Sequence, residues 1–327
     1  MDQIYNLDSD SSLLDQLSIG IRNRDIEQKF IYQGDGAKLY YQQKNSNQLY
    51  TNCTLEKKDF LTFLNNEVIL SGKKVAIISL GCGNSGTEKF IFENIDTTNI
   101  DYFGVDSSID MLKLSIENVK ELKMNKNFIC ADFSTKHFRL ELEHSSKGYD
   151  DRIFVFFSNT FGNIKHTNII DILGNLLDTG EKIWLDVRLR KGTSIQDDLE
   201  LSNIMAGDLA RKEIENSYLG VLKHLGVNVE HGQLVMKTST EKTVGALKFM
   251  FSFLFEEKSE INIKGDKLFI LPGESVMVQE IYTYDPDKLI NFFNEHGFNF
   301  LDKQTKGYRG QFLFEKNGSG KTKKRDS

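Results

Sequence analysis

The sequence has few of the residues that build disulfides or metal sites. Its three cysteines, Cys53, Cys82 and Cys130, lie far apart and form no C-x-x-C motif, so neither a disulfide framework nor a cysteine-based zinc site is expected. The six histidines show no H-x-x-x-H spacing, the pattern that places two ligands on one helix face. We therefore expect reduced thiols and no structural metal.

Long apolar runs and an excess of basic residues are missing too. No apolar stretch approaches the ~18 residues of a membrane helix, and the start, MDQIYNLDSD, lacks the basic and apolar parts of a signal peptide. The 41 Lys and Arg residues are outnumbered by 47 Asp and Glu residues, whereas a nucleic-acid binder normally has a basic face. These observations predict a cytoplasmic protein with neither a membrane nor a nucleic-acid partner.

Alternating strand and helix patterns fill the middle of the 327-residue chain. Apolar strands separated by helical segments are expected at 75–80, 102–105, 127–130, 152–157 and 181–187. Such alternation is typical of a parallel sheet covered on both faces, so we predict a doubly wound α/β fold. After residue 195 a helix-rich stretch and antiparallel strand patterns follow, which predict a second, smaller mixed α+β lobe.

The segment SLGCGNSGTEKF, residues 79–90, follows the first of these strands and contains Gly81, Gly83 and Gly86. A glycine turn between a first strand and a first helix is where open α/β sheets bind nucleotides, because backbone N–H groups point into the crevice there. The G-x-G-x-x-G spacing alone leaves a plain tight turn, a dinucleotide site and another adenosine cofactor as alternatives.

Two aspartates follow the next two strands. Asp106, in YFGVDSSIDML, stands 25 residues after Gly81, at a strand end where a carboxylate can accept both ribose hydroxyls. Asp132, in FICADFS, ends the third strand and is suited to bind an adenine amino group. The three strand ends together favour S-adenosylmethionine (SAM), whose sulfonium needs no phosphate cradle, over the NAD of an oxidoreductase.

These motifs resemble known methyltransferase motifs. VAIISLGCGNSG, YFGVDSSIDML, ICADFS and RIFVFFSNTFGNI resemble the class I SAM-dependent methyltransferases. FFSNTFGNI, FIYQGDGAKLYYQQKNSNQLYTNCTLE and MVQEIYTYD resemble, more narrowly, the histidine Nα-methyltransferase family of ergothioneine biosynthesis. The likeness spans roughly residues 28–315 and implies a Rossmann-like methyltransferase sheet.

The resemblance also implies site residues. The expected cofactor-binding residues come from the glycine loop, the strand ends and an aromatic lid: Tyr32, Gly81, Gly83, Ser85, Thr87, Asp106, Ser107, Asp132, Phe133 and Ser158. The expected acceptor and catalytic residues are Tyr50, Asn163 and Glu280, with Tyr282 beside Glu280. The family's Glu-Ile-Ser is Glu-Ile-Tyr here, and no tyrosine stands in QDDLELSNIMAGD, so histidine is expected to be a poor substrate.

Two acceptor positions can be argued from the residues themselves. Strict alternation would place Val276, Val278, Glu280 and Tyr282 on one face of a strand. A carboxylate on an apolar face is costly to bury unless it is paired, so Glu280 should meet either a basic side chain or the acceptor. Asn163 follows the fourth strand, where it is either a plain turn residue or an acceptor contact across the crevice from the glycine loop.

Together these patterns predict a SAM-dependent N-methyltransferase for an amino acid or a related amine-bearing small molecule. An O-methyltransferase for a small carboxylate or phenol is an alternative, and a non-catalytic SAM-binding partner protein is another. We expect an N-terminal cap over residues 1–60, a SAM-binding core over 61–195, a substrate-binding lobe over 196–315 and a flexible tail over 316–327.

Overall fold

The computed structural model describes residues 4–7, 10–34, 36–39, 72–166, 169–190 and 215–318. An eight-stranded sheet forms its core, in the order β1-β4-β3-β2-β5-β6-β13-β12. Six of its strands are parallel and come from residues 4–188: β1 (Ile4–Asn6), β2 (Val75–Leu80), β3 (Ile100–Asp106), β4 (Lys126–Cys130), β5 (Asp151–Phe156) and β6 (Lys182–Arg188). β13 (Arg309–Lys316) pairs antiparallel with β6, and β12 (Phe298–Lys306) pairs antiparallel with β13.

Helices cover both faces of this sheet, which confirms the doubly wound α/β prediction. α5 (Gly86–Glu93) and α6 (Ile109–Val119) pack on one face. α7 (Lys136–Ser145), α8 (Ile169–Leu176) and α12 (Pro286–Glu295) pack on the other. The strands between them are almost fully buried, as expected for parallel strands covered on both sides.

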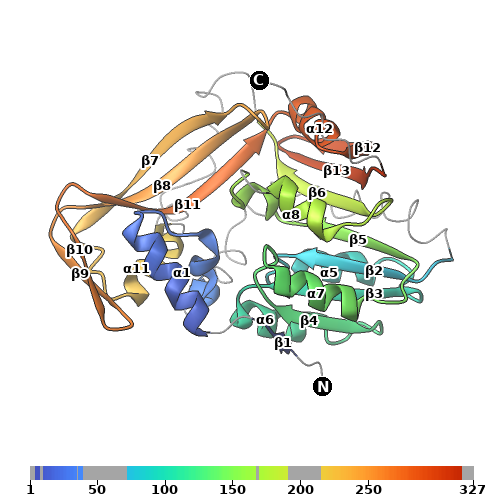
Figure 1. Ribbon diagram of the computed structural model, residues 1–327, viewed down its shortest axis with the longest axis horizontal. Helices are drawn as coiled ribbons and strands as arrows, with labels where there is room; N and C mark the ends of the chain where they lie inside the picture. Colours follow the sequence, from blue (N-terminus) through green and yellow to red (C-terminus); the bar gives the residue numbers. More distant parts are fainter. Residues whose placement is uncertain are drawn as a thin grey trace.

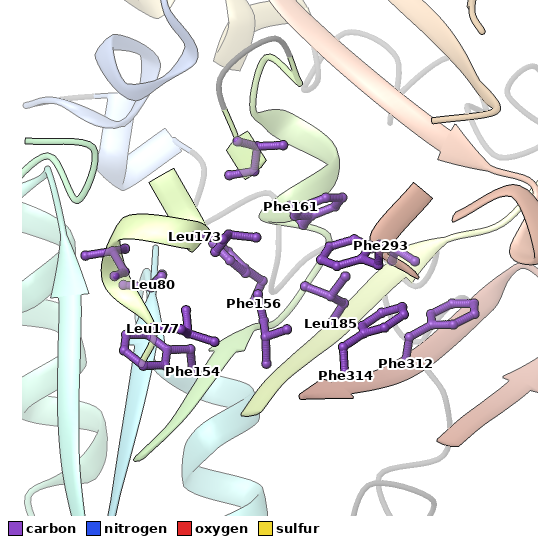
Figure 2. Close-up of a cluster of buried hydrophobic side chains, with 14 of the residues drawn as sticks. Leu80, Phe154, Phe156, Phe161, Leu173, Leu177, Leu185, Phe293, Phe312 and Phe314 are labelled. Carbon is purple, nitrogen blue, oxygen red and sulfur yellow. The ribbon is translucent and has the colours of Figure 1, made fainter. Parts of the chain in front are cut away.

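The C-terminal elements α12, β12 and β13 complete the core rather than the lobe to which the sequence analysis assigns them. Asp285 caps α12 by accepting hydrogen bonds from the N–H groups of Asp287 and Lys288, with Pro286 at the first helical position. The helix carries Phe293, whose ring stacks on Phe314 of β13 at 4.2 Å between centroids. Figure 2 shows these rings in one apolar cluster with side chains of β5, β6 and α8.

The lobe is an antiparallel sheet with helical segments from the start of the chain and from the stretch just before its first strand. β7 (Gly232–Glu241), β8 (Ala246–Phe255) and β11 (Ser275–Tyr284) form the sheet, and β9 (Ser259–Ile263) and β10 (Asp266–Ile270) form a separate hairpin. The long strands reach from the core to α1 (Asp10–Arg22), η1 (Gln28–Tyr32) and α11 (Gly220–His224) (Figure 1). The N-terminal helical segments therefore pack with strands more than 200 residues away. No helix in the described ranges is both long and apolar enough to cross a bilayer.

β11 contains a bulge that corrects the expected strand face. Met277 pairs with Ser252 and Gln279 pairs with Phe251, so Val278 is an extra residue with no partner on β8. Directly opposed residues of an antiparallel pair share a face, and an extra residue reverses the alternation beyond it. Glu280 and Tyr282 therefore do not continue the face of Val276, because the bulge lies between them.

Candidate active site

A cavity of about 370 Å³ lies at the carboxyl edge of the parallel strands. β2 lies between β3 and β5 there, which is the switch point where open α/β sheets bind ligands. η1 and β11 of the lobe line the same cavity. Ten of the residues expected at the site line it: Tyr32, Gly81, Gly83, Asp106, Ser107, Asp132, Phe133, Ser158, Asn163 and Glu280.

The glycine loop is held tightly against the sheet. Gly81 has a φ of 69°, and a Cβ there would lie 2.5 Å from Cγ2 of Thr160, so only glycine fits. The N–H groups of Gly81 and Cys82 donate to the carbonyl of Val105 at 2.8 and 2.9 Å, and that of Gly83 donates to Asp106 at 2.9 Å. The loop thus uses these three donors internally instead of directing them at a phosphate.

Asp106 ends β3 with its carboxylate buried beneath the loop. One oxygen accepts the N–H of Gly83 and the other accepts the N–H of Ser108, both at 2.9 Å. Burial raises the pKa of Asp106 to about 6, although these backbone donors oppose the rise. Each carboxylate oxygen has a further lone pair, so Asp106 can still accept hydroxyl donors from the cavity.

Asp132, at the end of the next strand, is paired with a lobe residue that the sequence analysis did not find. Lys29 of η1 lies 2.6 Å from its Oδ2, and Ser134 donates to its Oδ1 through both N–H and hydroxyl. Burial opposes ionisation, but Lys29 and Ser134 outweigh it and hold the pKa of Asp132 below its ordinary value. This ion pair joins η1 to the core beside the cavity.

On the acceptor side, Glu280 is paired within the protein. Its Oε1 lies 3.2 Å from the ammonium of Lys248, and its Oε2 accepts the hydroxyl of Tyr282 at 3.2 Å. Lys248 lies directly opposite Tyr282 in the β8–β11 ladder. The basic side chain that was one of the two expected partners of Glu280 is therefore present in the lobe itself.

Tyr282 supports Glu280 and does not line the cavity. Its ring packs against His166, with 4.3 Å between centroids, because the β11 bulge and the β8 partner turn it toward the core. Burial, followed by the nearby Glu280 charge, raises the pKa of Tyr282 far above its ordinary value. Tyr282 is thus a protonated donor to Glu280 instead of the acceptor contact we expected.

Two other expected site residues, Ser85 and Thr87, are also not among those that line the cavity. Ser85 is buried, and its hydroxyl bonds to Tyr102 at 2.7 Å and to Ser115. Thr87 exchanges a hydrogen bond of 3.2 Å with Ser158. Ser85 therefore holds the left-handed turn at which α5 begins. Thr87 reaches the cavity only through its hydrogen bond to Ser158, which lines it. Tyr50 lies outside the described residues, as does the 196–208 segment.

The candidate bases and nucleophiles near the cavity are neutral. His166 is mostly buried, and burial lowers its pKa to about 3 while its Nε2 bonds to the Tyr284 hydroxyl at 2.7 Å. Cys82 lines the cavity, but burial, with the charge of Asp106, raises the pKa of its thiol well above the ordinary value. Within the described ranges no three His, Cys, Asp or Glu residues gather as a metal site.

A second, smaller chamber of about 30 Å³ adjoins the acceptor side of the cavity. It shares four lining residues with the main cavity, and its other lining residues come from η1, the loop after β5, β6, β11 and the segment before α11. The full set is Gln28, Ile31, Tyr32, Ser158, Asn159, Asn163, Arg188, Ser217, Tyr218, Gln279 and Ile281. Neither this chamber nor the place of the segment from Ile26 to Lys29 in the wall of the main cavity was predicted from the sequence.

Comparison with known proteins agrees with the geometry. A family model described as "Histidine-specific methyltransferase, SAM-dependent" matches residues 10–195, more than half of the chain. No curated protein matches the sequence.

Several solved structures are similar in fold. A SAM-dependent methyltransferase from Clostridium acetobutylicum is 12% identical, with 85% of this chain and 99% of that chain covered and a TM-score of 0.46. CalS10, an amino pentose methyltransferase from Micromonospora echinaspora, is 9% identical, with 80% and 90% covered and a TM-score of 0.39. The glycopeptide N-methyltransferase MtfA is 8% identical, with 80% and 86% covered and a TM-score of 0.40.

Proposed function

Because this chain belongs to the family of histidine-specific, SAM-dependent methyltransferases, we propose that it methylates the amino group of an amino acid or a related small molecule. The observation that carries the proposal is the composition of one cavity wall. Asn163 of the core and Glu280 of the lobe line the same cavity as Gly81 and Asp106. An acceptor held by the first pair would meet a cofactor held by the second.

The cofactor half of the cavity offers the hydrogen-bond acceptor and the apolar surface that SAM would need. The buried carboxylate of Asp106 has lone pairs left for ribose hydroxyls, and Met111, Phe133 and Ile172 supply apolar wall for a purine and a thioether. The N–H groups of Gly81, Cys82 and Gly83 donate to Val105 and Asp106 and so do not point at a ligand, which suits a cofactor without phosphate. When bound, SAM supplies an electrophilic methyl group on a sulfonium.

The protein's part in the transfer is to position a neutral amine in line with that methyl group. The nitrogen lone pair forms the new N–C bond, the S–C bond breaks with its electrons left on sulfur, and one proton leaves to water. Positioning two bound reactants can supply up to ~7–11 kcal/mol of the barrier. We assign this positioning to Asn163, with Tyr50 as a further hydrogen-bond partner and Glu280 at the far wall.

Histidine is disfavoured by the state of Glu280. Its carboxylate is paired with Lys248 and accepts the hydroxyl of Tyr282, so the ion pair offsets the negative charge that would attract an imidazolium. A site built around one set of polar partners rejects a mismatched substrate strongly. We therefore propose an amino acid other than histidine, or an amine related to one.

The cavity wall also separates the alternatives. A non-catalytic binding protein would bind cofactor and transfer nothing. An NAD-dependent enzyme would need loop donors for its pyrophosphate, but the loop uses them internally.

The test is a turnover screen with SAM labelled on its methyl group, read by mass spectrometry. The acceptor panel contains the twenty amino acids, their decarboxylated amines, small carboxylic acids and phenols. We expect label on nitrogen of one or more amines, with histidine among the weak acceptors. Label only on oxygen would support the O-methyltransferase alternative, and binding of S-adenosylhomocysteine with no turnover of any compound would support the non-catalytic one.

A further inference from the structure

The small chamber beside the acceptor side contains a cation that makes no contact with an anion of the described residues. Arg188, the last residue of β6, lines it, and no residue in the described parts of the chain forms an ion pair or hydrogen bond with its guanidinium. The carboxylate on the same strand, Asp186, is already engaged: its Oδ2 accepts the N–H of Ser158 at 2.8 Å and lies 2.5 Å from Arg309. Among the described residues, Arg188 therefore interacts electrostatically with Asp186, which is already paired with Arg309, but has no carboxylate in hydrogen-bond contact.

Two buried amide oxygens line the same chamber without donors. Gln279 is only 2% exposed, and its Nε2 donates to the carbonyl of Glu280 at 2.9 Å, so its Oε1 is the atom left over. Gln28 likewise uses its Nε2 on the hydroxyl of Tyr32 at 2.8 Å. Neither Oε1 has a partner among the described residues. Buried acceptors of this kind normally have one, so both can receive N–H groups from a ligand.

We propose that this chamber binds the head group of an α-amino acid, an inference that rests on the proposed N-methyltransferase function. Arg188 pairs with the α-carboxylate, and the carbonyls of Gln28 and Gln279 accept hydrogen bonds from the α-amino group. Asn163 belongs to both cavities, so an amine held there lies on the side that faces the cofactor. A volume of about 30 Å³ holds two water-sized groups, the size of a carboxylate and not of a whole amino acid.

This arrangement distinguishes an amino acid from a simple amine. An α-amino acid places an anion and a hydrogen-bond donor on one carbon, and the chamber offers a cation and two acceptors within one small space. A decarboxylated amine satisfies the glutamines but leaves Arg188 unpaired. The side chain of the amino acid would then extend into the main cavity toward Glu280 and Lys248.

The test compares amino acids with their decarboxylated amines in wild-type protein, Arg188→Met and Arg188→Lys. In the wild type we expect the accepted amino acid to exceed its amine by about 100-fold in kcat/KM, since a charge-assisted ion pair is lost in the amine. Arg188→Met should lower kcat/KM for the amino acid by about the same factor, leave the amine within about threefold, and so abolish the discrimination. Arg188→Lys should restore part of it. Arg139→Met, an exposed pair with Glu143 on α7, is the matched control for loss of a positive charge.

Binding measurements keep this inference separate from the function on which it rests. Calorimetry with the same amino acid is done on the complex with S-adenosylhomocysteine, whose own affinity should be unchanged in Arg188→Met because Arg188 does not line the main cavity. If wild-type protein methylates only amines without a carboxylate, or if Arg188→Met binds and methylates the amino acid as well as wild type, the head-group site is wrong and the N-methyltransferase proposal stands. If no amine binds or is methylated, both proposals fail.

Discussion

Removal of the Asp106 carboxylate should weaken cofactor binding more than any other single change in the cavity. Two of its hydrogen bonds are spent on the N–H groups of Gly83 and Ser108, and two more would go to ribose hydroxyls. Bonds from hydroxyls to a buried carboxylate are worth about 1.5–3 kcal/mol each, and part of this offsets the cost of ionising the buried group. We therefore expect Asp106→Ala to lose roughly 2–4 kcal/mol, or roughly 30- to 1,000-fold in Kd.

The assay is isothermal titration calorimetry with S-adenosylhomocysteine at pH 7.5. Asp106→Asn is the companion variant, because it keeps the shape and one backbone acceptor while it removes the charge. The control is Asp96→Asn, which removes an exposed carboxylate that accepts hydrogen bonds from Thr98. Thermal unfolding of each variant distinguishes a loss of affinity from a loss of folding. A Kd for Asp106→Ala within threefold of wild type, in a folded protein, would falsify the ribose role.

Four further outcomes follow from the same geometry. Ribose hydroxyls would favour the ionised form of Asp106, whose pKa is about 6 in the free protein. The affinity for S-adenosylhomocysteine should therefore be full above pH 7 and fall up to about tenfold by pH 5, and an affinity that does not change between these pH values contradicts the ribose contact of Asp106. Gly81→Ala should lower the free energy of unfolding by about 1–3 kcal/mol, since the added methyl meets Thr160 and φ is positive; an unchanged melting temperature contradicts it. Glu280→Gln should lower kcat/KM for the acceptor by about 10- to 100-fold, because Lys248 is left unpaired at the acceptor wall, while the Kd for S-adenosylhomocysteine stays within twofold; equal activity removes Glu280 from the site. Histidine should give at least about tenfold less methylated product than the preferred amino acid in the mass-spectrometric screen, and ordinary trimethylation of histidine would show that the altered contacts are neutral.

The core could be predicted from the sequence because its strands are buried on both faces. The run from Val75 to Leu80 is apolar throughout and is a strand with the expected bounds. α7 was not predicted: only Phe138 and Leu142 of its residues are fully buried, and Leu140 is 54% exposed. A helix that buries only a narrow stripe of side chains shows little apolar periodicity. The strand β12 was not predicted either, because most of its side chains are polar and exposed.

The same difference between local and long-range information applies to the site residues. The positions of Asp106 and Asp132 follow from where strands end, which local pattern shows. Their partners do not: Lys29 lies 103 residues from Asp132 in the chain, and the pairing of Lys248 with Glu280 depends on a bulge at Val278 that an alternating pattern conceals. Contacts between distant segments and a single extra residue in a strand leave no local trace in composition or period.

The place of β13 between β6 and β12 sets the order in which this chain can finish folding. Synthesis delivers β6 long before β13, so the β6 edge stays unpaired until residues 309–316 emerge. The lobe elements α11 and β7 to β11 are made in that interval, tethered to an open sheet. Phe312 and Phe314, which close one end of the apolar cluster, are among the last described residues to arrive. A ribosome stalled before residue 309 would therefore hold a sheet with an exposed, apolar edge, the kind of species on which chaperones act and from which aggregates grow.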